Sequence, residues 1–289
     1  MKLLTFGEIL FDKFGDTYTL GGAPLNTAAH FKQLGGDSAI ISAVGNDELG
    51  RKAFEEIEKL GIDASMIDVL EDVPTGIAAV TLHGKDATYE FSYPSAWDRI
   101  CVYDDDIEDI GDDTIIYFGT LALRSTTSFL ALEKILGETT PKEIFVDVNI
   151  RKDFYSDDLI AFCLDHATIL KINEDEINIV ADAIGLDDAD GDSLYAWLCE
   201  NTAIETLLLT RGKHGSDLYT EECKVHVPCS DVKVVDTVGA GDSLSAAYLF
   251  FKYSMEMENK EALLKATAVA DYVVSNKGAI PLYSAKMFV

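Results

Sequence analysis

The feature that most limits the fold of this 289-residue chain is an alternation of short apolar runs with helical patterns. Turn-forming residues bound the apolar runs, which span 38–44, 115–119, 144–148, 168–172 and 206–210. The helical stretch 48–60 carries Ala53, Ile57 and Leu60 on one face and meets Gly61 where a helix should end. Strands separated by helices pair in parallel. The sequence therefore predicts an α/β protein with a mostly parallel central sheet flanked by helices.

Two regions break this alternation. Residues 11–20 and 75–93 have strand patterns with no helix between their strands, and the second is expected to be a hairpin that turns near HGKD at 83–86. We expect 11–20 and about 75–97 to form a small antiparallel lid. No repeat, low-complexity tract or linker divides the sequence, so we predict that 1–289 is a single domain with the lid inserted in it.

Charge, cysteine content and hydropathy exclude several classes of protein. The net charge of −28 opposes binding to nucleic acid or to anionic membranes. The five cysteines contain no C-x-x-C pair, which favours reduced thiols over disulfides or a zinc site. Glu8 and Asp12 interrupt the apolar start before it could serve as a signal peptide, and no apolar run approaches the length of a membrane span. We predict a cytoplasmic protein without nucleic-acid or membrane partners.

The segment DTVGAGD at 236–242 places small residues directly before a helical pattern. Gly239, Ala240 and Gly241 let backbone N–H groups converge there, and the helix dipole adds about half a positive charge. We interpret this as an anion hole. Asp242 at its edge would accept the proton of a hydroxyl that attacks a phosphate held in the hole. The alternative is a glycine-rich turn in which Asp242 only caps the helix.

Two other phosphate-binding motifs do not fit. A Walker A loop needs a hydroxyl residue after its Gly-Lys pair, and neither Gly84-Lys85 nor Gly212-Lys213 is followed by one. The dinucleotide fingerprint G-x-G-x-x-G/A fails at Leu244, where Gly or Ala is needed. A dinucleotide-dependent oxidoreductase is therefore a weak alternative.

DTVGAGD matches the second signature, D-T-x-G-A-G-D, of the ribokinase-like (PfkB) carbohydrate kinases. GGAPLN at 21–26 resembles their first signature, and the resemblance extends from GEILFD at 7–12 to GAIP at 278–281. It implies a three-layer ribokinase-like fold with the lid over the substrate, and phosphoryl transfer from ATP, with Mg²⁺, to a sugar hydroxyl. Asp242 would be the base, and Gly239, Ala240 and Gly241 would stabilise the transferring charge.

The resemblance also implies a sugar site. In the family, the residues that match Asp12, Gly22 and Asn26 hydrogen-bond sugar hydroxyls, which suits a carboxylate, an amide and a closely approaching backbone. Taken alone, GGAPLN would be a turn before a helix capped by Asn26. Phe91 of the lid is expected at the sugar. Arg151 of DVNIR resembles the arginine of the D-P-N-[LI]-R found in fructokinases and would clamp a phosphate, with a surface ion pair as the alternative.

For the phosphates and metals, the resemblance points to KINEDE at 171–176, which matches the family's N-x-x-E. It places Asn173 near the ATP phosphates and Glu176 in the water shell of Mg²⁺. Taken alone, the segment would be a helix N-terminus with acids that complement the dipole. Lys171 is expected to offset phosphate charge. Several members of the family bind a monovalent cation through the residue that matches Asp236, which makes K⁺ a candidate cofactor.

The remaining nucleotide contacts are also implied by the resemblance. TRGKHG at 210–215 looks like the family's nucleotide-binding turn, with Thr210, Gly212 and Gly215 at the matching positions. Thr267 stands eleven residues before the glycine of GAIP, where many relatives have an asparagine that approaches the adenine.

The acceptor is the least specified part of the reaction. Fructokinase-like lids contain Arg-Asn-Pro-Ser-Ala, whereas this lid reads YEFSYPSAWD and lacks the arginine. We predict an ATP-dependent kinase of a primary hydroxyl on a small sugar, with fructose as the first candidate. 2-Keto-3-deoxygluconate, ribose or a nucleoside are alternative acceptors, and a catalytically silent sugar-binding regulator is an alternative function. An exposed edge of the lid sheet favours a homodimer through the lid.

Overall fold

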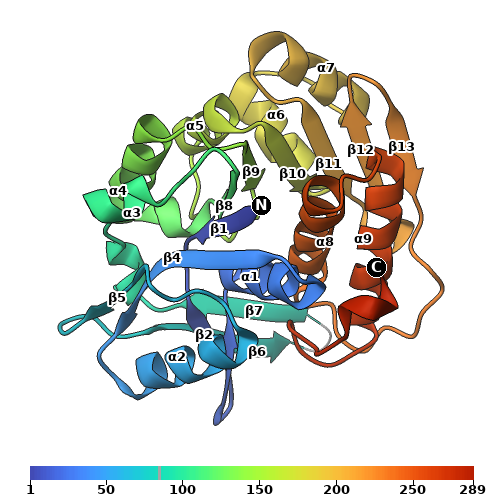
Figure 1. Cartoon of the computed structure of the whole chain (residues 1–289). Coiled ribbons are helices and arrows are strands. Elements are labelled where there is room, and N and C mark those ends of the chain that lie inside the picture. Colours follow the sequence, from blue (N-terminus) through green and yellow to red (C-terminus); the bar gives the residue numbers. More distant parts are fainter. Residues whose placement is uncertain (84–85) are drawn as a thin grey trace.

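The computed structural model describes residues 1–83 and 86–289, so the expected HGKD turn lies partly outside the described residues. Within them, a nine-stranded sheet forms the centre of the molecule (Figure 1). Its strands are β1 Lys2–Phe6, β4 Asp37–Gly45, β5 Ile67–Leu70, β8 Thr114–Gly119, β9 Glu143–Asp147, β10 Ile169–Asn173, β11 Thr206–Thr210, β12 Ser216–Thr220 and β13 Lys224–Val227. Their order across the sheet is β13-β12-β11-β10-β9-β8-β1-β4-β5.

The sheet is parallel from β11 to β5, and β12 and β13 add antiparallel strands at one edge. The five predicted apolar runs coincide with β4, β8, β9, β10 and β11. Parallel strands covered on both faces need nearly continuous apolar residues, which is the pattern that predicts them. β1, β5, β12 and β13 were not among the predicted strands. β13, with the sequence KVHV, carries more polar residues because it lies at the edge of the sheet.

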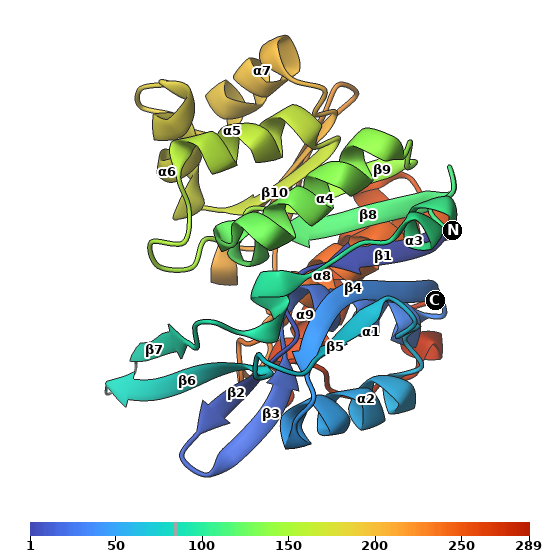
Figure 2. The ribbon, with the colours of Figure 1, turned by 90° about the vertical axis from the view of Figure 1, so that its left-hand side faces the viewer.

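Helices cover both faces of this sheet, as Figure 2 shows in side view. One face carries α1 Ala23–Leu34, α2 Glu48–Leu60, α8 Ala240–Leu249 and α9 Asn259–Val274. The other carries α4 Thr126–Glu138, α5 Asp157–His166, α6 Glu176–Ile184 and α7 Gly191–Asn201. Alternate residues of one strand point to opposite layers: Leu3 packs with α8 and α9, and Leu4 packs with α4 and α5. The predicted three-layer α/β fold is confirmed.

A second, four-stranded sheet forms the lid. Its strands are β2 Leu10–Phe14, β3 Thr17–Gly21, β6 Gly76–His83 and β7 Asp86–Phe91, in the order β3-β2-β6-β7. Each hairpin is antiparallel, and the two hairpins join through parallel pairing of β2 with β6. Because β2 begins just after β1 ends, the lid lies at the carboxyl edge of the main sheet (Figure 2). Its edge strands are β3 and β7; the homodimer through the lid stays a prediction.

Two helix starts differ from the sequence expectation. α1 begins at Ala23 with Gly22 as the capping position, so Asn26 lies inside the first turns and does not cap the helix. The reason is Pro24, whose fixed backbone angle suits the first turn of a helix. α8 begins at Ala240 and is buried on all sides from Ser243 to Leu249. The spacing of Leu244, Ala247, Tyr248 and Phe251 in the sequence predicts a helix from about Ser243 with only one buried face. The observed helix is buried all round because α1 and α9 both pack against it.

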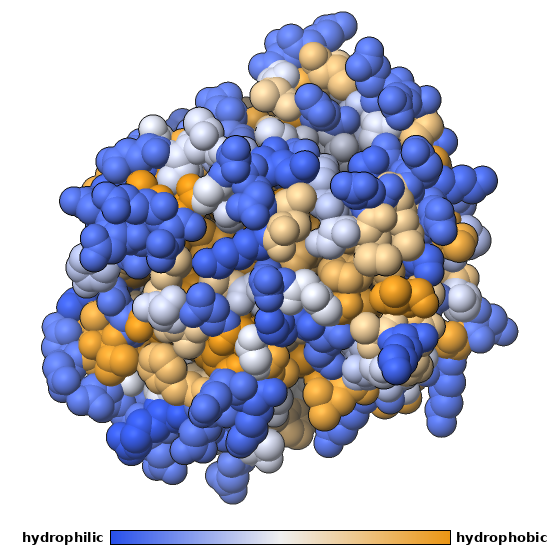
Figure 3. All heavy atoms as spheres, in the orientation of Figure 1, coloured by the Kyte–Doolittle hydropathy of each residue, from blue (hydrophilic) through white to orange (hydrophobic). Residues whose placement is uncertain are grey.

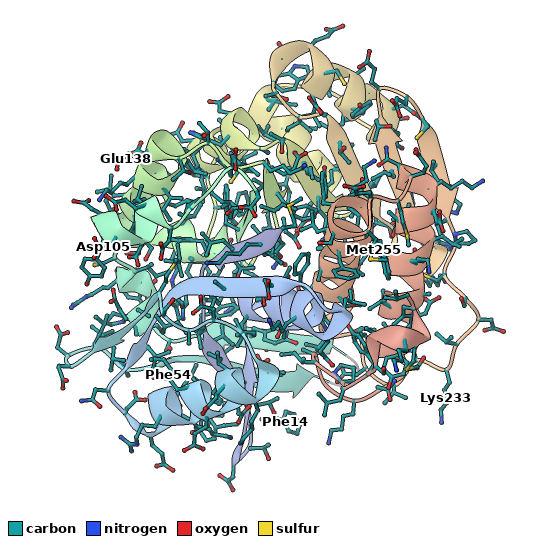
Figure 4. The ribbon with its side chains drawn as sticks, viewed as in Figure 1. Phe14, Phe54, Asp105, Glu138, Lys233 and Met255 are labelled. Atoms are coloured by element: carbon teal, nitrogen blue, oxygen red, sulfur yellow. The ribbon has the colours of Figure 1, made fainter. Side chains whose placement is uncertain are left out.

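The acidic residues lie mainly on the outside. Asp105 on the short helix α3 Asp104–Glu108 and Glu138 on α4 extend outward in Figure 4. Hydrophilic residues predominate on the face shown in Figure 3 and separate smaller apolar areas. Among residues 1–83 and 86–289, no helix has the length and apolar content needed to cross a bilayer.

The start of α2 generates a stability prediction. Asp47 Oδ1 accepts the Gly50 N–H and Asp47 Oδ2 accepts the Thr75 N–H, each at 2.8 Å. Burial works to raise the pKa of Asp47, but the hydrogen bonds from Thr75 and Gly50 outweigh it and lower the pKa. Asp47→Ala should lower the free energy of unfolding by about 1 to 2 kcal/mol at neutral pH, through the loss of a helix cap.

Urea denaturation measures this change, with Asp16→Ala in the exposed β2–β3 turn as the control. Because the folded-state pKa of Asp47 is lowered, its stabilisation is present at neutral pH and is lost only as the pH falls through that low pKa. Equal unfolding midpoints for Asp47→Ala and Asp16→Ala at pH 7 would contradict the capping role.

Candidate active site

A cavity of about 350 Å³ lies between the lid and the carboxyl edge of the main sheet. Ligand sites in open parallel sheets form at this edge, because the loops after several strands meet there. Glu8 follows β1, Arg151 follows β9, and Asn173 ends β10. The lid contributes Leu10, Asp12, Tyr89 and Phe91, and α1 with its preceding turn contributes Gly22, Ala23 and Asn26. The five residues predicted to bind the sugar therefore line one cavity, which we call the acceptor cavity.

A second cavity, of about 630 Å³, adjoins the first. It extends past the turn after β11 to α9, and the predicted nucleotide residues Gly212, Gly215 and Thr267 line it. Both cavities are lined by Thr210, Thr237 and Gly241. We call the second the nucleotide cavity. The two meet at the first turn of α8, which is where a group would pass from one ligand to the other.

The first turn of α8 has the geometry of an anion hole. Gly239 has φ of 80°, and a Cβ at this position would lie 2.5 Å from the backbone oxygen of Ala279, so only glycine fits. The first intrahelical hydrogen bond runs from Ser243 N to Gly239 O at 2.8 Å. In the part of the chain that the structure describes, no acceptor is bonded to the amides of Gly241 and Asp242. Two N–H donors therefore remain for an anion.

The Asp242 carboxylate lies at the edge of this turn and reaches into the acceptor cavity. Asn26 Nδ2 donates to Asp242 Oδ2 at 2.8 Å. Burial raises the pKa of Asp242 to about 6, although the hydrogen bond from Asn26 opposes the rise. Asn26 Oδ1 is buried and has no hydrogen-bond partner among the described residues. A buried acceptor without a partner requires a donor, and a ligand hydroxyl in the acceptor cavity would supply one.

Lys171 lies beneath the anion hole and is already paired. Its Nζ donates to both oxygens of Asp147, at 2.9 and 2.8 Å, and the Tyr117 hydroxyl donates to Asp147 at 3.2 Å. Burial acts to lower the pKa of Lys171, and the negative charge of Asp147 more than offsets this, so the pKa is raised. A Cβ at Gly241 would lie 3.3 Å from Lys171 Nζ. The ammonium therefore stays charged directly below the place where phosphate is expected.

Asn173 and Glu176 are linked to each other. Asn173 Oδ1 accepts the N–H of Glu176 at 3.0 Å, and Glu176 Oε2 accepts the N–H of Asn173 at 2.9 Å. Glu176 Oε1 accepts the N–H of Ile150 at 2.8 Å, and the residue is only 4% exposed. Among the described residues, no group of three or more His, Cys, Asp or Glu is arranged to hold a metal ion. These residues do not fit a preformed Mg²⁺ site, and the Mg²⁺ role of Glu176 stays a prediction.

Asp236 joins the loop before the anion hole to the segment after α9. Its Oδ1 accepts the Val238 N–H at 3.1 Å and its Oδ2 accepts the Gly278 N–H at 3.0 Å. Both oxygens therefore fix the backbone, and the structure adds no observation in favour of the predicted K⁺ ligand. Asp236 does help to hold Ala279 against Gly239.

Arg151 lines the acceptor cavity and, within the described chain, has no acidic partner within salt-bridge distance. In a protein with a net charge of −28, an unpaired guanidinium at a cavity favours the phosphate clamp over a surface ion pair. Burial raises the pKa of Asp12 to about 6, and the charge of Arg151 opposes the rise.

The sequence reasoning missed several residues of the site. Glu8 lines the acceptor cavity, and its Oε1 accepts the Ala23 N–H at 3.2 Å. Burial raises the pKa of Glu8 to about 7. Asp147, which holds Lys171, and Tyr89, which lines the cavity from the lid, were also absent from the expected set. Glu8 lies just after β1, and Asp147 is the last residue of β9. Acidic residues at the carboxyl ends of parallel strands are candidates for a ligand site, and this position could have identified both.

Comparison with known proteins agrees with this geometry. Residues 4–286 match the model of the pfkB family carbohydrate kinases. A fructokinase of Rhizobium leguminosarum bv. trifolii is 31% identical over 274 residues, covering 89% of this chain and 80% of the relative.

Two solved structures share the fold. One is the aminoimidazole riboside kinase of Salmonella enterica, solved with aminoimidazole riboside and an ATP analogue. Its TM-score is 0.83 at 24% identity, and the match covers 100% of this chain and 98% of the kinase chain. The other is a fructokinase of Vibrio cholerae O395, solved with fructose, ADP and a calcium ion. Its TM-score is 0.83 at 21% identity, and the match covers 99% of this chain and 98% of the fructokinase chain.

The parallel main sheet with a lid at its carboxyl edge is the fold that this chain shares with these two kinases. This chain belongs to the pfkB family, and it is a carbohydrate kinase.

The raised pKa of Glu8 generates a prediction for stability against pH. Between pH 4.5 and about 7 the folded state keeps a proton on Glu8 that the unfolded state releases, so the contribution of Glu8 to stability falls as the pH rises through this window. Glu8→Gln removes the ionisation and can keep the bond to Ala23. We expect it to raise the free energy of unfolding by roughly 1 to 3 kcal/mol at pH 8 and by little at pH 4.5.

Urea denaturation at both pH values checks this, with the exposed Glu55→Gln as the control. A stability difference between Glu8→Gln and the wild type that does not change from pH 4.5 to pH 8 would show that Glu8 does not titrate in this way.

Proposed function

We propose that this carbohydrate kinase transfers the γ-phosphoryl group of ATP to a primary hydroxyl of fructose. The observation that carries the proposal is the position of Asp242. Its carboxylate reaches the acceptor cavity from the first turn of α8, where Gly241 lines both cavities and two amides have no acceptor among the described residues. A base beside an anion hole, between two adjoining cavities, suits in-line phosphoryl transfer.

In this mechanism the acceptor hydroxyl lies beside Asp242. As its oxygen bonds to the γ-phosphorus, its proton passes to Asp242 and the bond from the γ-phosphorus to the bridging oxygen of ADP breaks. The amides of Gly241 and Asp242 stabilise the charge of the transferring group, since they are held in place before the reaction begins. Lys171 adds a fixed positive charge below them. Mg²⁺ carried in by ATP would neutralise part of the phosphate charge, and Glu176 would hold its bound water.

The charges of the acceptor cavity favour a neutral sugar. Glu8, Asp12 and Asp242 line it, and Arg151 is its one cation without an acidic partner among the described residues. A sugar acid such as 2-keto-3-deoxygluconate would bring another carboxylate into this surrounding, which like-charge repulsion disfavours. Carboxylates and the free Asn26 Oδ1 accept hydrogen bonds, as a molecule with several hydroxyls requires. The names of the relatives support fructose among the neutral sugars.

A panel of acceptors tests the proposal: fructose, ribose, a nucleoside and 2-keto-3-deoxygluconate, each assayed for acceptor-dependent release of ADP from ATP. We expect the highest kcat/KM with fructose and the lowest with the sugar acid. A higher kcat/KM with ribose or the nucleoside would overturn the assignment of fructose as the acceptor, but would leave the kinase activity in place. No acceptor-dependent ADP release would instead support a silent sugar-binding regulator.

Replacement of the base gives a sharper prediction. Asp242→Asn should lower kcat by at least ~10²-fold, the lower range for loss of a general base. The amide can still pair with Asn26, so fructose binding measured by calorimetry should stay close to that of the wild type.

Asp12→Asn is the matched control, because Asp12 is another carboxylate of the same cavity but belongs to lid strand β2 and not to the first turn of α8. It should raise the KM for fructose more than it lowers kcat. An unchanged kcat for Asp242→Asn would remove Asp242 from the mechanism.

A further inference from the structure

A buried arginine with no part in the reaction proposed above lies at the base of the lid. Arg124 belongs to the turn Leu121–Arg124 that follows β8, and only 4% of its side chain is exposed. Its Nε donates to Asp98 Oδ1 at 2.7 Å, and its Nη2 donates to Asp98 Oδ2 at 2.9 Å. The same Nη2 donates to the backbone oxygen of Ser92 at 2.7 Å. Ser92 directly follows β7, so a core side chain holds the point where the lid joins the core.

Three aromatic rings surround the guanidinium. Its central carbon lies 3.9 Å from the ring centroid of Trp97, 4.8 Å from that of Phe154 and 5.3 Å from that of Tyr93. Trp97 is only 1% exposed and packs against Gly76, the first residue of lid strand β6. A buried charge is costly unless a partner and good geometry compensate it, and here Asp98 and the ring faces do so for most of the guanidinium. Its Nη1 is buried and has no hydrogen-bond partner among the described residues. The cluster therefore fixes both the start of β6 and the end of β7.

The segment around Asp98 is fixed to the core by further hydrogen bonds. Ser95 N donates to Asp98 Oδ2 at 2.8 Å, and Ser128 Oγ of α4 donates to the Trp97 backbone oxygen at 2.8 Å. The Ile77 N–H of β6 donates to Ser92 Oγ at 2.9 Å. Arg124 is the member of this network that reaches across from the turn after β8.

The cluster also reaches the acceptor cavity through one aromatic contact. Phe154 meets Phe91 edge to face, with centroids 6.1 Å apart and planes at 78°. Phe91 lines the acceptor cavity and stacks on Tyr89, which lines it as well, at 6.5 Å. Arg124 thus holds Phe91 from two sides: through the backbone of the next residue, Ser92, and through the ring of Phe154.

We propose that Arg124 is a positioning residue for the acceptor site: it clamps the base of the lid to the core and thereby sets the Phe91 and Tyr89 wall against which the sugar binds. It acts on the acceptor and not on the nucleotide, because its contacts lead to the lid. The proposal rests on the sugar kinase function proposed above.

The clamp requires arginine specifically. A guanidinium donates to two acceptors in one plane while its faces stack on rings, whereas an ammonium is a compact charge that does neither as well. Arg124→Lys should therefore keep the charge next to Asp98 and still loosen the lid. Arg124→Met keeps the length and removes the charge.

The test compares Arg124→Met and Arg124→Lys with Arg99→Met. Arg99 belongs to the same segment and pairs with Asp72 at 2.8 Å, but it is 48% exposed. Among the described residues its guanidinium stacks on no aromatic ring. For Arg124→Met we expect the KM for fructose to rise by at least ~10-fold, since small displacements of positioning groups have effects of this order. The KM for ATP should change little, Arg124→Lys should be intermediate, and Arg99→Met should match the wild type.

A purely structural role predicts a different result, namely a lower melting temperature with an unchanged KM for fructose in the folded fraction, and that result would overturn the proposal. If Arg124→Met does not fold, Phe154→Leu takes its place, because it cuts the contact to Phe91 and leaves the ion pair intact. It should raise the KM for fructose alone; equal changes in both KM values, or none, would contradict the proposal.

Failure of the proposed function can be told apart from failure of the clamp. If the wild type phosphorylates another acceptor, the same comparison is made with that acceptor. If the wild type phosphorylates no acceptor, amide hydrogen exchange of the ligand-free protein tests whether Arg124 clamps the lid. Exchange in β7 and in residues 92–98 should be faster in Arg124→Met than in Arg99→Met, and equal exchange would refute the clamp.

Discussion

The arrangement of the whole site depends on the burial of α8. This helix is enclosed by the sheet, α1 and α9, so its first turn cannot move independently of the core. Gly239 lets that turn pack directly against Ala279, and Asp236 holds the segment in place through Gly278. The N–H groups that would receive a phosphoryl group are therefore oriented by the packing of the protein interior. Stabilisation of charge by groups oriented in advance needs no reorganisation during the reaction.

Placing a phosphate site in so acidic a chain requires control of local charge. Much of the net charge of −28 lies on the outside, as on α3, where it is solvated. Within the site, Lys171 is held by Asp147 below the anion hole, and Arg151 has no acidic partner among the described residues. Burial raises the pKa of Glu8 to about 7, so Glu8 is partly protonated near neutral pH, which limits its repulsion with the other carboxylates of the cavity. The pKa of Asp242, raised to about 6, leaves this residue mostly ionised and able to act as a base.

The sequence predicted the features that follow from local pattern. Buried parallel strands are apolar runs, and the DTVGAGD turn needs small residues wherever it occurs, so both were visible. The sequence could not show that Asn26 lies within α1 and pairs with Asp242, because that contact joins residues 216 positions apart. It also left the roles of Arg124 and Asp98 unseen, since a buried ion pair between separate elements has no local pattern. The sequence did not predict edge strands such as β13, because a partly exposed strand lacks the continuous apolar run of a buried one.

The central claim is that Asp242, as a carboxylate, takes the proton of the acceptor hydroxyl. The most direct test is the dependence of kcat/KM for the sugar on pH, since this ratio reports the ionisation of the free enzyme. It should be measured in the Glu8→Gln and Asp12→Asn double variant, in which Asp242 is the remaining cavity carboxyl with a pKa raised to about 6. We predict that kcat/KM falls about tenfold per pH unit below this pKa and is constant above it. A flat profile between pH 5 and pH 8 would contradict the claim.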